Sequence, residues 1–208
     1  MKFDLIILKL MIKIHNYLYV KIGSKSIKLN GGIHPKHRLM NYHQFFLDNI
    51  KEKSDVLDIG CSSGELSHDI AKKANKVVAI DINGSKIKKA KEKYNRYNIK
   101  YIVADATKME CNEIFDYVVL SNVLEHIEDR YNFLLAIKPL ARDFLIRVPM
   151  INRSWITLYK RELGCEYRLD DTHYTEYTFD TFRKEIEAVG LKIITYSIQF
   201  GEIWAKVG

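Results

Sequence analysis

The stretch "VLDIGCSSGEL" (residues 56–66) decides the fold. It begins as an apolar run, turns at Gly60, and reaches a second glycine, Gly64, before charged residues return. An apolar run, a glycine turn and then a helical pattern are typical of the first strand-to-helix turn of a parallel sheet, where a nucleotide approaches the backbone. The two glycines remove side chains from that approach, and a helix that begins near Gly64 offers unpaired backbone N–H groups. A Gly-x-x-x-Gly turn is weak evidence by itself, because glycine also marks ordinary tight turns.

After residue 54 the chain alternates between strand and helix patterns. Continuously apolar runs predict strands at 55–60, 76–81, 99–105, 115–121 and 143–149, and helical spacing fills 64–74, 83–97, 128–137 and 178–190. Strands that are apolar throughout belong to parallel sheets covered on both faces. Residues 191–207 hold two strands hinged near Gly201 with no helix between them, which predicts an antiparallel hairpin. The predicted fold is α/β: a doubly wound, Rossmann-like seven-stranded sheet, mostly parallel, with an antiparallel C-terminal hairpin and an N-terminal helical extension.

Length and cysteine usage limit the class of protein. A chain of 208 residues with 47% hydrophobic content can bury one substantial core. Its three cysteines, Cys61, Cys111 and Cys165, are an odd number at no disulfide-like or metal-like spacing, and no secretory signal precedes them. We therefore expect a cytoplasmic protein, and the sequence predicts no metal site.

The positive charge is concentrated at the N-terminus. Residues 1–54 hold ten Lys and Arg against three acidic residues, whereas residues 55–208 are balanced, so the whole net charge of +7 precedes the glycine turn. This asymmetry predicts two parts: a basic helical extension or cap at 1–54 and a second domain at 55–208. Such a segment suits a membrane surface, a nucleic acid or a phosphorylated substrate, and it also suits a merely solvated basic face.

The first 23 residues predict an amphipathic helix with a wide apolar face. Asp4, Lys9 and Lys13 interrupt the apolar run too often for a membrane span. The apolar face is suited to packing on the domain, to pairing with a second copy, or to peripheral contact with a membrane. After a polar break at 23–32, a second helix is predicted from Pro35 to Ile50.

Acidic residues follow two further predicted strands. Asp81 ends the second strand, 21 residues beyond Gly60, where a carboxylate can accept hydrogen bonds from ribose hydroxyls. Asp105 follows the third strand and is suited to an adenine amino group. Each alone is equally well explained as a helix N-cap. At successive strand ends they indicate an adenosine site.

These residues resemble the class I S-adenosylmethionine-dependent methyltransferases. The matching motifs are "LDIGCSSG" (57–64), in which Ser62 stands where the family most often has glycine, Asp81, Asp105, and "FDYVVLSNVLEHIED" (115–129). The resemblance covers residues 55–208, including the terminal hairpin. It implies S-adenosylmethionine as cofactor, S-adenosylhomocysteine as product, and a cofactor site made of Asp58, Gly60, Cys61, Gly64, Asp81, Ile82, Asp105, Ala106, Ser121 and Asn122. Cys61 then fills a small position in the loop and is no nucleophile.

A looser resemblance concerns the segment before the core. Residues 30–46, "NGGIHPKHRLMNYHQFF", are similar to methyltransferases of surface-polysaccharide and glycan assembly. This likeness implies that His34, Arg38 and Tyr42 close over the cofactor.

Two histidines are the candidate catalytic bases. A base is needed only where the methyl acceptor must lose a proton, and imidazole titrates near neutral pH. His126 lies in "LEHIED" and His173 in "DDTHYTEYT", and each also has a structural explanation as a residue that shapes its loop.

The motif after the fourth strand bears on the acceptor. An exocyclic-amine nucleic-acid methyltransferase carries Asn/Asp-Pro-Pro-aromatic there, but this chain reads "SNVLEH" (121–126), and no cysteine is suitably placed for cytosine-carbon methylation. The "VLEHI" form resembles the branch that acts on small molecules, lipids and sugars, and residues 150–178 are rich in Tyr and Arg, which suit rings and anionic groups. We therefore expect O-methylation of a small, anionic or sugar-containing acceptor by a monomer or homodimer, with nucleic acid not expected as a partner.

Three alternative functions belong to other classes of protein. A dinucleotide-dependent oxidoreductase is disfavoured, because Ser62 occupies the glycine position at which backbone approaches a pyrophosphate. An RNA methyltransferase would use the basic segment, and its binding would weaken steeply with salt. A non-catalytic subunit would bind the cofactor and use the N-terminal helix to contact a partner.

Overall fold

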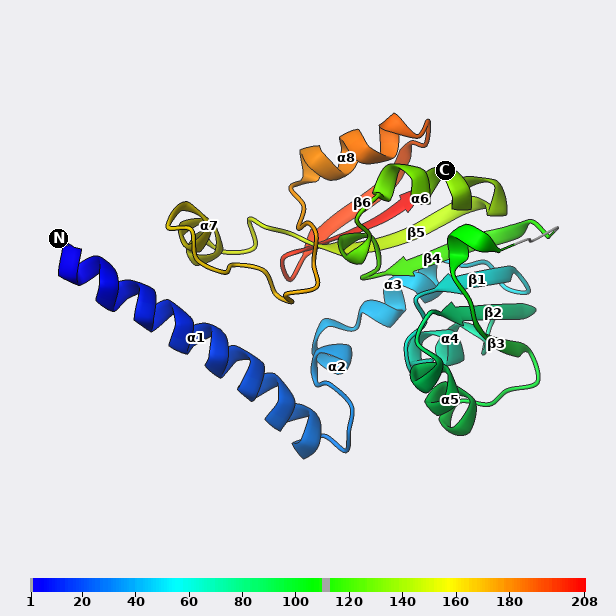
Figure 1. The fold of residues 1–208 in the computed structure, drawn as a ribbon. Coiled ribbons are helices and arrows are strands. Elements are labelled where there is room, and N and C mark those ends of the chain that lie inside the picture. The colour runs from blue at the N-terminus through cyan, green and yellow to red at the C-terminus, as the bar shows by residue number, and fades with distance from the viewer. Residues whose placement is uncertain (1, 110–112) are drawn as a thin grey trace.

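The computed structural model describes residues 2–109 and 113–208, in which a seven-stranded sheet forms the body (Figure 1). The strands are β1 (Asp55–Ile59), β2 (Lys76–Asp81), β3 (Ile99–Val103), β4 (Phe115–Ser121), β5 (Ala141–Pro149), β6 (Ile193–Gln199) and β7 (Glu202–Val207). Their order across the sheet is β3-β2-β1-β4-β5-β7-β6. The first five strands are parallel, and β7 runs antiparallel to both of its neighbours. The predicted fold class is confirmed, including the C-terminal hairpin.

Helices cover both faces of the sheet. On one face lie α3 (Tyr42–Asn49), α4 (Glu65–Ile70) and α5 (Gly84–Lys93), and on the other lie α6 (Arg130–Ile137) and α8 (Phe179–Ala188) (Figure 1). Successive strand residues point to opposite faces, so Val56 joins the core under α3 and α4 while Leu57 joins the core under α6 and α8. The continuous apolar runs of β1, β2, β4 and β5 are thereby explained, because both faces of these strands are buried, whereas the edge strands β3 and β6 are partly exposed.

The carboxyl ends of the parallel strands meet at one edge of the sheet. Three short 3-10 turns accompany the helices: η1 (Ala106–Lys108) after β3, η2 (Leu124–His126) after β4, and η3 (Lys138–Leu140) before β5. The first two bring the chain back across the strand ends at this edge. The loops after β1 to β4 are therefore neighbours in space although they are far apart in the sequence.

The N-terminal extension begins with a long helix, α1 (Lys2–Leu29), that projects from the body (Figure 1). Its attachment is narrow. Ile12 is its one buried side chain among the described residues, and one turn later Asn16 donates to the carbonyl of Glu166 at 2.8 Å and accepts from Lys160 at 2.6 Å. Most of the other apolar side chains of the helix are exposed, so packing on the domain does not account for them.

Helix boundaries differ from the predicted ones at three places. The first helix continues into the polar stretch, as far as Leu29, and the hydroxyls of Ser24 and Ser26 donate to carbonyls of the preceding turn there. The helix predicted over 35–50 is broken at Asn41, whose φ of 48° is left-handed, into α2 (Lys36–Met40) and α3. Residues 150–178 also contain a helix that the pattern did not indicate, α7 (Trp155–Glu162).

A buried ion pair joins the parallel and antiparallel parts of the sheet. Arg147 of β5 binds Glu202 of β7 through two hydrogen bonds, from Nε to Oε2 at 2.5 Å and from Nη2 to Oε1 at 2.9 Å. The Trp204 indole also donates to Glu202, at 3.0 Å, and the Tyr42 ring lies 3.6 Å from the guanidinium carbon of Arg147. Both charged side chains are almost fully buried, so each charge is stabilised by the other in place of water.

We expect Glu202→Gln to lower the free energy of unfolding by about 3–5 kcal/mol, because it leaves the Arg147 charge buried and uncompensated. Urea denaturation measures the change. The matched control is Asp143→Asn, which removes a more exposed pair between the same two strands, Lys206 to Asp143 at 2.8 Å. That variant should cost less than about 1 kcal/mol, and equal costs for the two variants would contradict the assignment.

Candidate active site

The loop after β1 is built from residues with left-handed backbone. Gly60 (φ 72°), Ser62 (φ 52°) and Gly64 (φ 86°) alternate in this conformation. A Cβ on Gly60 would lie 2.7 Å from a methyl carbon of Val123, and one on Gly64 would lie 2.8 Å from the Tyr101 hydroxyl. Both glycines are therefore required by the protein's own packing as well as by their backbone angles.

Asp81, at the end of β2, holds this loop. One carboxylate oxygen accepts from the Ser62 backbone N–H at 2.9 Å, and the other accepts from Asn83 N–H at 2.8 Å. The side chain is buried. An ionised carboxylate has about four acceptor positions, so two remain for further donors.

Two adjoining cavities lie along the strand ends. The larger, of about 1050 Å³, follows the ends of β1 to β4, and the smaller, of about 300 Å³, lies between the β1 loop and the segment around α2. Both are lined by Gly60, Ser62, Ser121 and Asn122, so they meet there. This size is ordinary for a small-molecule site.

Most of the predicted cofactor residues line these cavities. The larger cavity is lined by Gly60, Asp81, Ile82, Asp105, Ala106, Ser121, Asn122 and the candidate base His126. The smaller is lined by Asp58, Gly60, Cys61, Tyr42 and His34. Gly64, Arg38 and His173 line neither, and Arg38 is exposed.

Asp58 is buried beneath the smaller cavity. Its carboxylate accepts from the Ser67 hydroxyl at 2.5 Å. Burial, and to a smaller extent the charge of Asp81, raise the pKa of Asp58 to about 7, while the bond from Ser67 opposes this rise. Burial likewise raises the pKa of the neighbouring Cys61 thiol, which keeps this sulfur protonated and unreactive. Cys111 lies outside the described residues.

Asp105 caps the turn that follows β3. It accepts from the Thr107 N–H at 3.0 Å and from the Thr107 hydroxyl at 2.7 Å, and these bonds lower its pKa. The N-cap role considered for this residue is therefore real. It does not exclude a ligand, because the side chain is partly exposed and lines the larger cavity.

The segment around α2 closes one side of the smaller cavity with residues that the sequence analysis did not single out. Lys36 and His37 line the cavity together with Arg147 of β5. The Tyr42 hydroxyl is 2.9 Å from His37 Nδ1, and burial lowers the pKa of His37 to about 4. Burial, with the charge of Arg147, also lowers the pKa of Lys36. Helical spacing alone could not indicate these residues, because they reach the site only through the break at Asn41.

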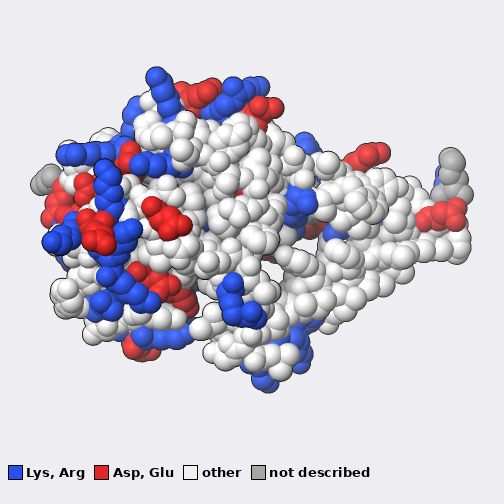
Figure 2. All heavy atoms as spheres, turned by 180° about the vertical axis from the view of Figure 1, so that it is seen from behind, with Lys and Arg blue, Asp and Glu red and all other residues white. Residues whose placement is uncertain are grey.

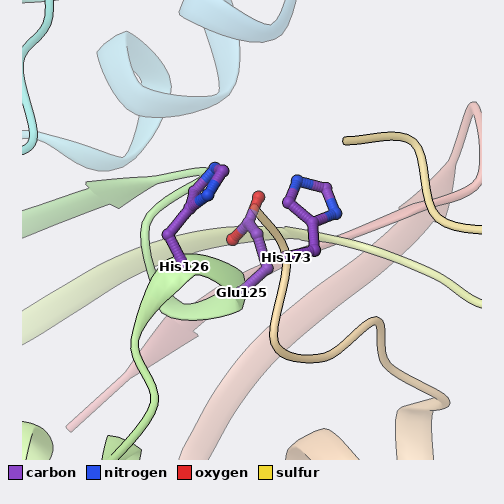
Figure 3. Close-up of side chains that lie close together, drawn as sticks. All are labelled: Glu125, His126 and His173. Atoms are coloured by element: carbon purple, nitrogen blue, oxygen red, sulfur yellow. The ribbon is translucent and has the colours of Figure 1, made fainter. Parts of the chain in front are cut away.

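The two candidate bases lie together with a third titratable group. His126 of η2 and His173, from the segment between α7 and α8, have ring centroids 4.7 Å apart in an edge-to-face arrangement. The Glu125 carboxylate lies between the two rings (Figure 3), and a ligand atom of each group lies within 4.8 Å of the others. Burial raises the pKa of Glu125 to about 7, and burial, with the His173 charge, lowers the pKa of His126.

The fold and the position of the cavities can be compared with those of known proteins. A sheet of order β3-β2-β1-β4-β5-β7-β6 whose ligand cavity lies over the ends of β1 to β4 is the arrangement of class I S-adenosylmethionine-dependent methyltransferases. Residues 56–142 also match the family model described as "Methyltransferase domain". This match agrees with the resemblance that the sequence motifs showed to class I S-adenosylmethionine-dependent methyltransferases.

Relatives and solved structures agree with this resemblance. The chain is 26% identical over 144 residues to a ubiquinone biosynthesis O-methyltransferase of Rickettsia conorii, covering 68% of this chain and 50% of the relative. It is 29% identical over 174 residues to the protein of the same name from Actinobacillus pleuropneumoniae, covering 76% and 73%. The chain spans about half the length of the Rickettsia relatives that it matches.

Among solved structures, the fold is similar to magnesium protoporphyrin IX methyltransferase from Synechocystis with bound S-adenosylhomocysteine. The TM-score is 0.63 at 19% identity, and the match covers 83% of this chain and 82% of that one. An N-methyltransferase from Bradyrhizobium japonicum, also in complex with S-adenosylhomocysteine, gives 0.60 at 16% identity, with 83% and 85% covered. Identities this low show the shared fold.

The raised pKa of Asp58 predicts a pH-dependent stability. Because the folded-state pKa lies above the ordinary value, the folded state holds this proton more tightly, and the stability it contributes is lost as pH rises from about 4 to about 7. Asp58→Asn should therefore gain stability relative to the wild-type chain as pH rises, by a few kcal/mol at most above pH 7. Urea unfolding of cofactor-free protein at pH 5 and pH 8 measures this. Asp180→Asn, an exposed position, is the control, and a difference that does not grow with pH would contradict the burial effect.

Proposed function

We propose that this chain transfers a methyl group from S-adenosylmethionine to a hydroxyl oxygen of a small-molecule acceptor. The observation that carries the proposal is the pair of joined cavities over the strand ends. Carboxylates lie along both: Asp58 at the smaller, and Asp81 and Asp105 at the larger. The cavities meet at Ser121 and Asn122, the end of the fourth strand.

The charges and sizes of the cavities suit the two halves of the cofactor. The smaller cavity takes the methionine half, where Asp58 accepts from the amino group directly or through water, and the backbone of Gly60 and Cys61 lies along the chain. The larger cavity takes the adenosine half. There Asp81 uses its remaining acceptor positions for the ribose hydroxyls, and Asp105 and the Ala106 backbone bind the adenine edge. Ile82, which is 78% exposed beside this cavity, covers one adenine face.

The reaction requires mainly that the acceptor hydroxyl be positioned in line with the methyl group of the cofactor. The cofactor supplies a methyl group on a sulfonium; the acceptor oxygen forms a bond to that carbon as the carbon–sulfur bond breaks, and the hydroxyl proton leaves. Orientation of this kind is worth effective molarities of about 10⁵ to 10⁸ M. Ser121 and Asn122 form the floor where the cavities meet, and His34 and Tyr42 close the side of the smaller cavity. Arg38 stays a predicted closing residue from its exposed position on α2.

The proton must leave through the part of the larger cavity that His126 lines, with His173 behind it. This supports the predicted involvement of both histidines. Relatives named for O-methylation in ubiquinone biosynthesis support a hydroxyl acceptor. The expectation of a sugar-containing or anionic acceptor stays a prediction, for which Lys36 at the smaller cavity and Lys86 at the larger supply positive charge.

Cofactor binding is the first test. Calorimetry should give a dissociation constant in the micromolar range for S-adenosylmethionine with the wild-type chain, equivalent to about −8 kcal/mol. Asp81→Ala should weaken it at least tenfold, because both the ribose contact and the anchor of the β1 loop are lost. Asp180→Ala, on the exposed side of α8, should leave affinity unchanged. No heat from the wild type at millimolar ligand would refute the cofactor assignment.

Turnover then separates an enzyme from a cofactor-binding subunit. Transfer of labelled methyl groups is measured with phenolic and catecholic acceptors beside sugar nucleotides and RNA. We expect transfer to hydroxyl groups of small molecules. Transfer to RNA alone would replace the proposed acceptor class, and cofactor binding without transfer to any acceptor would favour the non-catalytic subunit.

We further propose that α1 lies on an anionic membrane surface. Within the described residues no helix is long and apolar enough to cross a bilayer. One side of α1 nevertheless carries eight exposed apolar residues at helical spacing: Phe3, Ile6, Ile7, Leu10, Met11, Ile14, Tyr17 and Leu18. The helix is attached through Ile12 and Asn16 on the opposite side. In Figure 2 it projects at the right as a largely uncharged surface. The positive excess of residues 1–54 favours anionic lipid as the occupant.

Vesicle flotation tests this location. The wild-type chain should float with vesicles containing phosphatidylserine or phosphatidylglycerol, and binding should weaken with salt. The double variant Leu10→Glu, Ile14→Glu should stay with the soluble fraction. Tyr97→Glu with Ile114→Glu, equally exposed apolar positions on the domain, should float normally. Absence of flotation together with a stable dimer that the first variant dissociates would assign the face to a second copy instead.

A further inference from the structure

The strand β6 forms one edge of the sheet. It pairs with β7 on one side, and within residues 2–109 and 113–208 no strand lies on its other side. From residue 193 to residue 200 the segment carries no charged residue and no proline. Such an edge presents a row of backbone groups to any other strand, and proteins usually protect it with lysine, proline or a covering element. The opposite edge strand, β3, carries the exposed Lys100 in this way.

Exposed apolar side chains are concentrated along this edge. Ile194, Tyr196, Ile198 and Phe200 are between 50 and 63% exposed. The Tyr196 ring stacks on that of Phe179 at the start of α8, with centroids 4.1 Å apart, so its position beside the edge is fixed. Covering these side chains is the main favourable contribution that a partner at this edge would gain.

Phe200 occupies a turn position that disfavours it. The hairpin turns at Phe200 (φ 54°) and Gly201 (φ 72°), and a two-residue turn with two positive φ values normally contains Asn, Asp or Gly. A bulky residue in left-handed backbone is an outlier that requires a reason. The ring lies 6.3 Å from that of Trp204 and is still 63% exposed, so packing within one chain does not supply that reason.

The register of the hairpin decides which backbone groups point outward. Gln199 pairs with Glu202 across the two-residue turn, and in an antiparallel ladder alternate residues direct both their N–H and C=O groups to the same neighbour. Gln199 and Ser197 therefore bond toward β7. Ile198 and Tyr196 direct their backbone groups to the free edge.

The regular part of β6 is complementary to itself. It runs from residue 195 to residue 199, because a β-bulge interrupts the ladder before it and the turn follows it. When two copies are placed antiparallel about Ser197, Tyr196 of each copy lies opposite Ile198 of the other. These are the residues whose backbone groups point outward, so each pair can exchange both hydrogen bonds. An aromatic residue opposite a β-branched one is also a favourable cross-strand pair.

We propose that β6 pairs with β6 of a second copy of this chain, about a two-fold axis at Ser197. Just beyond the regular segment, the same register brings Phe200 of each copy close to Ile194 of the other. The exposed apolar side chains of the edge are then covered, and the unusual position of Phe200 is explained. Self-complementarity of one patch is what a two-fold dimer requires, whereas a strand from an unrelated partner does not require it.

The contact is separate from the proposed cofactor site. None of residues 193–200 lines either cavity, so the dimer does not depend on the proposed function. The paired segment is short compared with a standard protein interface, so we expect a dissociation constant in the micromolar range.

Sedimentation velocity across the micromolar range tests the assembly. The wild-type chain should change from one to two chains per particle as its concentration rises. Ile198→Lys should weaken association at least about tenfold, because a lysine on an edge strand opposes pairing. The matched control is Val103→Lys, a 55% exposed position on the other edge strand, which should associate like the wild type. Both variants should keep the melting temperature and S-adenosylmethionine affinity of the wild type, so a change in association does not report misfolding.

Cysteine cross-linking tests the register. In the proposed pairing Ser197 lies opposite its own copy at a non-hydrogen-bonded position, where Cα atoms are about 4.5 Å apart and a disulfide can form. Thr195 and its copy are offset by about 14 Å, which a disulfide cannot span. Under mild oxidation Ser197→Cys should therefore give a covalent dimer that reductant dissolves. Thr195→Cys, which has the same native cysteines, should not.

Three results would overturn the proposal. They are a wild-type chain that stays monomeric throughout the range, a dimer that Ile198→Lys leaves intact, and cross-linking of Thr195→Cys in preference to Ser197→Cys. The first result would leave the edge to a strand of a different protein. The second, together with dissociation by the double variant Leu10→Glu, Ile14→Glu, would place the contact on α1.

Discussion

The Asp81 carboxylate, with its hydrogen bonds to two backbone amides, is the constraint on which the site depends. It ties the left-handed loop after β1, through Ser62, to the end of β2 and the turn at Asn83. Both cavities share Gly60 and Ser62, so the position of this loop sets the shape of both. One buried acidic side chain thereby orders two neighbouring strand ends and still keeps acceptor positions for a ligand. Its structural role and its proposed binding role use different lone pairs of the same two oxygens.

The chain treats buried charge in two opposite ways. At the edge of the smaller cavity, Arg147 and Glu202 satisfy each other, and Trp204 and Tyr42 complete their surroundings. Asp58, by contrast, accepts from the Ser67 hydroxyl but has no cationic partner among the described residues. Burial therefore raises the pKa of Asp58 to about 7, and it does the same for Glu125. The first arrangement stabilises the sheet, whereas the second leaves a buried carboxyl group beneath the cavity that a bound donor can satisfy. Unsatisfied buried groups of this kind are where function is expected.

The N-terminal extension combines two separate tasks. Its second part, from Ile33 to Ile50, belongs to the site, because Lys36 and His37 line the smaller cavity and Tyr42 lies against Arg147. Its first part, α1, contacts the body around Ile12 and Asn16, lines the smaller cavity with Ile27 near its C-terminal end, and leaves most of its apolar side exposed.

The sequence by itself determined the sheet and the cofactor edge. Continuous apolar runs separated by helical patterns indicated a mostly parallel sheet, and the absence of a helical stretch between the last two strands indicated a hairpin at Gly201. Asp81 and Asp105 were identifiable because each lies at the end of a predicted strand. Local pattern was less reliable for helix ends: the serines at 24 and 26 allowed α1 to continue, and one left-handed residue, Asn41, divided the next helix.

Only the tertiary structure decided the groups that come from distant parts of the chain. Arg147 and Glu202 are 55 residues apart, and His173 joins Glu125 and His126 from beyond β5 and α7. Nothing in the spacing of these residues marks them as partners, because contact between them depends on how the strands order themselves in the sheet. In the sequence, Glu125 looks like an ordinary charged residue of a turn. Its burial is a consequence of packing, which the sequence alone does not reveal.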